Sequence, residues 1–186
     1  MLVMILLLSR FAIGIELLHI LTEFMTIFVG VMMFVVVNNT RHFVKNDLVL
    51  FLGIVYLAVA VIDTFHVLTM FGLPYLQINS TEVTLKFWVF ARLFETTVLL
   101  SSGLFFTRKL NMYVMYAMSF LVVLLACLFG FYVEFPPVYT EGQLTVLKIG
   151  IELFIISILV LAATVFIKRR KAIEKVCFAI LFIIHI

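Results

Sequence analysis

The sequence predicts an all-α membrane protein, folded as a polytopic bundle of transmembrane helices. Of its 186 residues, 66% are hydrophobic and only 12% are charged, which is more apolar surface than a water-soluble domain can bury. The apolar segments are long and continuous, without the alternating pattern of β-barrel strands. Helices are therefore the spanning structures that the sequence favours.

Five segments are long enough to cross a hydrocarbon core of about 30 Å, which takes roughly 20 helical residues. In order, the predicted full spans are residues 12–37, 47–71, 84–107, 112–133 and 145–167. Each ends at a recognisable signal: Asn38 with Asn39, Gly72 with Pro74, Arg108 with Lys109, Pro136 with Pro137, and the basic run from Lys168 to Lys171.

Apolar segments at both ends of the chain are too short to span a membrane. Residues 1–8 are wholly apolar, and residues 176–186 begin a further helix. We therefore expect one integral-membrane domain over residues 1–186, with a partial helix at each end. The chain is expected to be a gene fragment or an excised domain, because both ends look like cut helices.

Basic residues predict the orientation. Loops 38–46, 108–111 and 168–175 carry the Lys and Arg residues, whereas loops 72–83 and 134–144 carry only acidic ones. The positive-inside rule predicts that the three basic loops are cytoplasmic. The net charge of +3 does not indicate a nucleic-acid partner, because the basic residues form short clusters between apolar segments.

Ionisable residues inside the predicted spans form one layer in the outer half of the bundle. Within each helix they recur at i,i+3 or i,i+4 spacing and so share one face. Charges in hydrocarbon are costly, and they therefore point to a functional site facing the bundle interior. The layer comprises Glu16, His19, Glu23, Asp63, His66, Arg92, Glu95, Lys148 and Glu152.

Two interpretations of this layer remain open from the residues alone. Arg92 can hold carboxylates in a bidentate fork, so one interpretation is a structural network of Arg92 with Glu23, Glu95 or Asp63. Alternatively it is a ligand-binding pocket that opens to the outside. Trp88 is then either an interfacial anchor or a wall of that pocket.

Several chemistries suit the histidines and carboxylates of the layer. His19, Glu23, Asp63 and His66 are suitable ligands for a divalent metal such as zinc, iron or manganese. A haem held between His19 and His66 is a further alternative, and either histidine is able to act as a proton sensor. No nucleophile with an adjacent base is evident, so we do not expect an enzyme.

Several motifs together resemble the third type of bacterial membrane-associated sensor (MASE) domain over about residues 10–175. The motifs are LHILTEF at 18–24, FLGIVYL at 51–57, DTFHVL at 63–68, FWVFARLFE at 87–95 and GQLTVLKI at 142–149. The resemblance implies that the family's characteristic polar positions here are His19, Glu23, Asp63, His66, Trp88, Arg92 and Glu95.

This resemblance implies a sensory input domain in the bacterial cytoplasmic membrane, which in relatives precedes a cytoplasmic output domain such as a histidine kinase or diguanylate cyclase. The expected partners are the lipid bilayer, a small ligand or ion from the outer side, the output domain and a second copy of the chain. The alternative is a transporter fragment, which predicts polar residues through the inner half as well.

Overall fold

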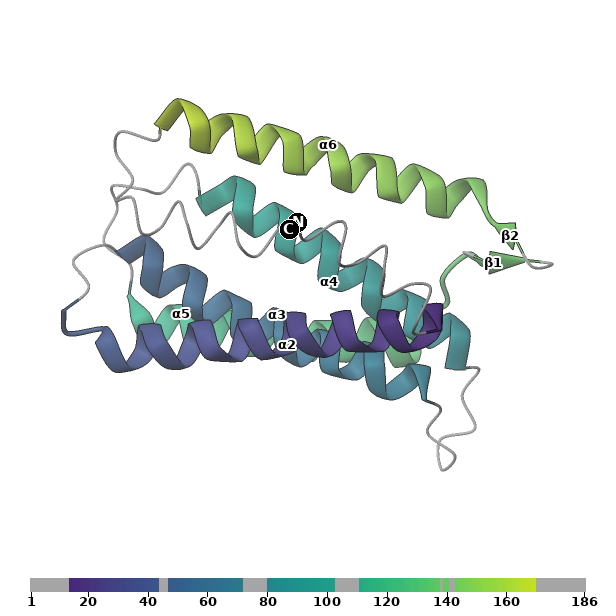
Figure 1. Cartoon of the computed structure of the whole chain (residues 1–186), viewed down its shortest axis with the longest axis horizontal. Helices are drawn as coiled ribbons and strands as arrows, with labels where there is room; N and C mark the ends of the chain where they lie inside the picture. Colours follow the sequence, from purple (N-terminus) through teal and green to yellow (C-terminus); the bar gives the residue numbers. More distant parts are fainter. Residues whose placement is uncertain are drawn as a thin grey trace.

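The computed structural model describes residues 14–43, 47–71, 80–102, 111–137, 139–140 and 143–169. These residues form five helices and a short hairpin (Figure 1). The helices are α2 (Ile15–Thr40), α3 (Asp47–Met70), α4 (Ser80–Ser102), α5 (Met112–Tyr132) and α6 (Val146–Arg169). The predicted partial helices at residues 1–8 and 176–186 lie outside the described residues, as do most of the predicted cytoplasmic loops.

Four helices have the length and composition of a membrane span: Leu17–Thr40, Leu48–Met70, Met112–Tyr132 and Val146–Lys168. The helical membrane bundle predicted from the sequence is thus confirmed, but not with five apolar spans. Helix α4 is 23 residues long, yet it carries Glu82, Lys86, Arg92 and Glu95 and does not qualify by composition.

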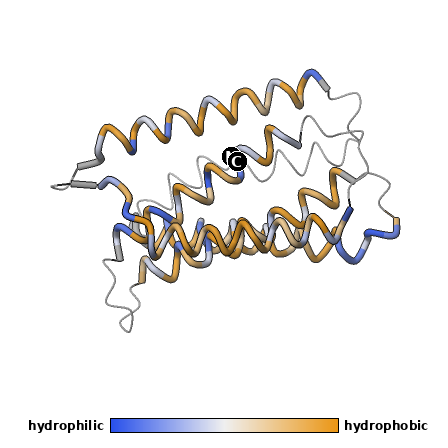
Figure 2. Tube along the Cα trace, turned by 180° about the vertical axis from the view of Figure 1, so that it is seen from behind, coloured by the Kyte–Doolittle hydropathy of each residue, from blue (hydrophilic) through white to orange (hydrophobic). Residues whose placement is uncertain are grey.

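Helix α3 is the central helix of the bundle. It packs against α2, α4 and α5, while α4 also contacts α5 and α6. Large hydrophobic side chains on α2, α5 and α6, among them Phe24, Phe120 and Leu153, are exposed. Figure 2 shows hydrophobic residues along most of each helix. A bilayer is the solvent in which such a surface is stable.

A short hairpin, which the sequence did not predict, precedes α6. Strands β1 (Tyr139–Thr140) and β2 (Gln143–Leu144) pair antiparallel, with Tyr139 opposite Leu144. The hairpin lies at the end of the bundle where α2 and α6 begin (Figure 1). Two-residue strands carry no periodic hydrophobic pattern, so the segment was expected to be a loop.

Glycines allow α2 and α3 to pack closely. A Cβ atom at Gly30 would lie 3.0 Å from the Tyr56 carbonyl oxygen, and one at Gly53 would lie 2.8 Å from the Cβ of Val37. Small residues at such contacts are a common basis of helix association in membranes. These contacts hold together the two helices that carry His19, Glu23, Asp63 and His66.

We expect Gly53→Ala to destabilise the bundle by about 1–3 kcal/mol, because the new methyl group overlaps the Val37 side chain and the helices must separate. Gly150→Ala is the matched control, since a Cβ there meets nothing within 4 Å. The stability of each variant is measured as its free energy of unfolding in mixed detergent micelles. Equal stability of the two variants would contradict this packing.

Candidate functional site

Arg92 of α4 binds two carboxylates, and the one on Asp63 joins α4 to α3. Its Nη2 donates to Oδ2 of Asp63 at 2.6 Å, and its Nη1 donates to Oε2 of Glu95 at 2.6 Å. Asp63 and Glu95 are both buried, with relative exposures of 2% and 7%. The sequence left three carboxylates open as partners of Arg92, and the structure selects these two.

His66 is oriented by a backbone contact from α4. Its Nδ1 lies 2.8 Å from the carbonyl oxygen of Thr84. A carbonyl oxygen only accepts hydrogen bonds, so the proton must be on Nδ1. In the neutral ring, Nε2 then keeps its lone pair. The residue's position is further fixed by Thr69, whose hydroxyl lies 2.9 Å from the His66 carbonyl and accepts from the Thr84 hydroxyl at 3.1 Å.

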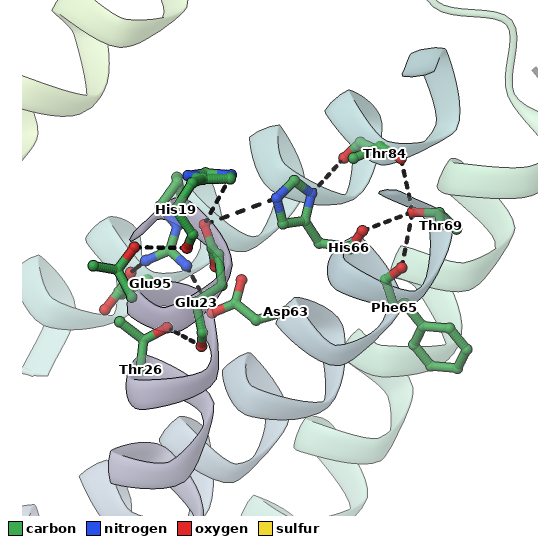
Figure 3. A network of polar contacts seen from close by, with 11 residues as sticks. His19, Glu23, Thr26, Asp63, Phe65, His66, Thr69, Thr84 and Glu95 are labelled. Atoms are coloured by element: carbon green, nitrogen blue, oxygen red, sulfur yellow. Dashed lines mark hydrogen bonds and ion pairs between the residues drawn. The ribbon is translucent and has the colours of Figure 1, made fainter. Parts of the chain in front are cut away.

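His19, Glu23 and His66 converge at the contact between α2 and α3 (Figure 3). Glu23 Oε1 lies 3.8 Å from His66 Nε2 and 4.0 Å from His19 Nε2. The two imidazole rings meet edge to face, with centroids 6.5 Å apart. The side chain of His19 is 49% exposed, whereas that of Glu23 is 11% and that of His66 only 4% exposed. The cluster thus has one accessible side and two buried members.

The side chain of Asp63 is not part of this convergence. The group of possible metal ligands contains His19, Glu23 and His66, whose ligand atoms all lie within 4.8 Å of one another. Asp63 instead directs Oδ2 to Arg92. Of the four metal ligands proposed from the sequence, the structure therefore brings three together. The side chain of Glu16, from the same predicted layer, lies outside what the structure describes.

Four buried polar atoms of the described residues have no hydrogen-bond partner. They are Asp63 Oδ1, His66 Nε2, Arg92 Nε and Tyr56 Oη. Buried polar groups are normally hydrogen-bonded, and an unsatisfied one costs free energy. Asp63 and His66 belong to the network drawn in Figure 3, and Arg92 contacts Asp63 and Glu95, so this network has spare capacity to bind a further polar group.

Trp88, Lys148 and Glu152 form a second cluster between α4 and α6. Lys148 Nζ lies 3.0 Å from the centroid of the Trp88 ring, a cation–π contact, and 3.2 Å from Glu152 Oε1. Among the described residues, no hydrogen bond or ion pair joins this cluster to the Arg92 network. The single layer expected from the sequence thus consists of two groups of contacts.

Lys86 is a buried ionisable residue that the sequence analysis missed. Its Nζ lies 2.9 Å from Glu82 Oε1 and donates to the Val133 carbonyl at 2.8 Å, so it ties α4 to the end of α5. The i,i+4 spacing of Glu82 and Lys86 was a usable signal. No signal in the sequence predicted the contacts of Thr69 and Thr84, because these contacts depend on how α3 and α4 face each other.

Comparison with families of known proteins places the chain. Residues 15–186 match the model of the family MASE3, described as a membrane-associated sensor domain. No curated protein and no solved structure matches the chain. The match covers nearly the whole chain, and it favours the sensor interpretation over the alternative of a transporter fragment.

Proposed function

Because the chain belongs to the MASE3 family of membrane-associated sensor domains, we propose that it is the sensory input module of a bacterial signalling protein. It receives a ligand, ion or proton from the outer side of the cytoplasmic membrane. In this proposal a histidine kinase or diguanylate cyclase reads the state of the bundle on the cytoplasmic side, and a second copy of the chain is a further partner.

The observation that carries the proposal is the polar network linking three helices. Glu23 of α2 faces His66 of α3, whose ring contacts the Thr84 carbonyl of α4. Arg92 connects α4 back to α3 through Asp63. A stimulus that binds or protonates His19 or Glu23 therefore acts on the α2–α3 contact and on the α3–α4 contact together. A ligand with unequal affinity for two arrangements of these helices shifts their populations.

The proposal includes α4 as a fifth membrane-crossing helix. Its charged residues have partners within the bundle: Lys86 with Glu82 and the Val133 carbonyl, and Arg92 with two carboxylates. Neighbouring helices α3, α5 and α6 pack around it. A charged helix is tolerated in a bilayer when its charges face the bundle interior and are paired. The basic loops 38–46, 108–111 and 168–175 then lie in the cytoplasm.

The test uses the full-length protein that carries this domain, with its signalling output measured in cells. We expect His66→Gln and Glu23→Gln to reduce the response to the stimulus by about 5-fold or more, within the usual range of coupling between sites. His42→Gln is the matched control, because His42 is exposed beyond the end of α2. The proposal fails if membrane insertion is intact and both site variants respond to every external stimulus as the control does.

A further inference from the structure

We infer that His19, Glu23 and His66 form a binding site for a divalent transition metal of the zinc class. One ring nitrogen of each histidine and a carboxylate oxygen of Glu23 lie within 4.8 Å of one another, and Nε2 of His66 and of His19 lie 3.8 and 4.0 Å from Glu23 Oε1. Two imidazoles and one carboxylate form a donor set that zinc accepts, with a fourth position left for water or another ligand.

Glu23 lacks a fixed positive partner. It is buried, with a relative exposure of 9%, and within ion-pair distance it meets only His19 and His66 among the described residues. Arg92, the cation of the network, is bound to Asp63 and Glu95 instead. A buried carboxylate without a counter-charge is unfavourable. A divalent cation would supply that charge directly.

His66 is prepared as a metal ligand. Its Nδ1–H donates to the Thr84 carbonyl, the contact by which proteins commonly fix the tautomer and direction of a ligating histidine. Its Nε2 is buried, has no hydrogen-bond partner, and faces Glu23 Oε1 at 3.8 Å, which is too long for a hydrogen bond. The lone pair of a 4% exposed histidine thus faces the carboxylate of Glu23.

The spacing of the three atoms needs only a small adjustment. In a tetrahedral zinc site with bonds of about 2.0–2.2 Å, ligand atoms lie about 3.3–3.6 Å apart. The observed separations of 3.8 and 4.0 Å, with all three atoms inside 4.8 Å, must therefore close by about 1.5 Å at most. His19 is exposed enough to rotate, whereas His66 is held by Thr84. Binding would draw the start of α2 onto α3.

The test is a direct titration of the purified chain in detergent with zinc alone, in competition with a fluorescent zinc indicator. We expect one zinc ion per chain in the wild type and no competition by excess magnesium, which prefers oxygen ligands. His66→Ala and His19→Ala should each lower zinc affinity by about 100-fold or more, since loss of even an outer-shell partner costs about 10–100-fold. His42→Ala is the matched histidine control and should bind as the wild type does.

His19→Ala is expected to fold normally, because that side chain is half exposed and its loss leaves the packing intact. A loss of zinc binding in this variant therefore cannot be due to misfolding. Asp63→Asn, checked for helix content by circular dichroism, should keep zinc binding, since Asp63 is held by Arg92. Absence of zinc binding in the wild type, or equal binding in the wild type and His19→Ala, would overturn the site. The role of the ion as stimulus rests on the proposed function, but its binding does not: zinc binding without any change in output would support the site and refute zinc sensing.

Discussion

Replacing Arg92 with methionine is expected to destabilise the bundle by about 3–5 kcal/mol, the usual cost of removing one partner of a buried ion pair. The loss leaves Asp63, 2% exposed, and Glu95 without the one cation that contacts them among the described residues. Both carboxylates must then protonate or draw in water. The measurement is the free energy of unfolding in mixed detergent micelles.

Three further variants distinguish this explanation from a general effect of losing a positive charge. Arg41→Met removes an exposed arginine at the end of α2 and should be nearly neutral. Arg92→Lys should be intermediate, because a single ammonium group does not form the fork to two carboxylates. Neutralising both carboxylates, by Asp63→Asn with Glu95→Gln in the Arg92→Met background, should recover part of the loss. If Arg92→Met is as stable as Arg41→Met, the ion pairs do not hold α3 to α4.

Replacing Phe87 with alanine is expected to cost about 2–4 kcal/mol, less than in a water-soluble core because lipid is as apolar as the protein interior. Phe87 is fully buried in the cluster with Ile62, Ala91 and Ala126. Its ring stacks on Phe65 at a centroid distance of 5.5 Å. The lost contacts and the remaining cavity account for this destabilisation. It is measured as the change in the free energy of unfolding in mixed detergent micelles.

Gly130 of α5 makes this prediction sharper. A Cβ at Gly130 would lie 2.6 Å from the Phe87 ring, so Gly130→Ala should destabilise the wild type. In the Phe87→Ala background the same methyl group enters the cavity, and its effect should become neutral or stabilising. The double-mutant cycle therefore predicts a strong favourable coupling. Additive effects would show that the ring and the glycine do not pack as described.

Much of the fold was predictable because each helix is determined by its own segment. Length and apolarity alone identified the five helical segments, and helix ends such as Thr40, Met70 and Tyr132 fall within a few residues of the predicted limits. Helix α4 was predicted as a span because its apolar residues outnumber its charges. It fails as an independent span because those charges need partners that only neighbouring helices provide.

The candidate site was predictable as a set of residues but not as a set of contacts. Helical spacing correctly placed His19 with Glu23 and Arg92 with Glu95, because residues three or four apart share a helix face. Spacing within a helix says nothing about which faces of different helices meet. The pairing of Arg92 with Asp63, of His66 with Glu23, and of Lys148 with Trp88 therefore came only from the packing.

The sequence by itself determined that this chain is a bundle of membrane helices with ionisable side chains inside it, because hydropathy and spacing are local properties. The tertiary structure decided how those side chains divide. It assigns Arg92 to Asp63 and Glu95, and leaves Glu23 with two histidines. That division depends on how each helix is rotated about its axis, and both close contacts such as Gly53 against Val37 and the ion pair of Arg92 with Asp63 fix that rotation only once the helices have packed.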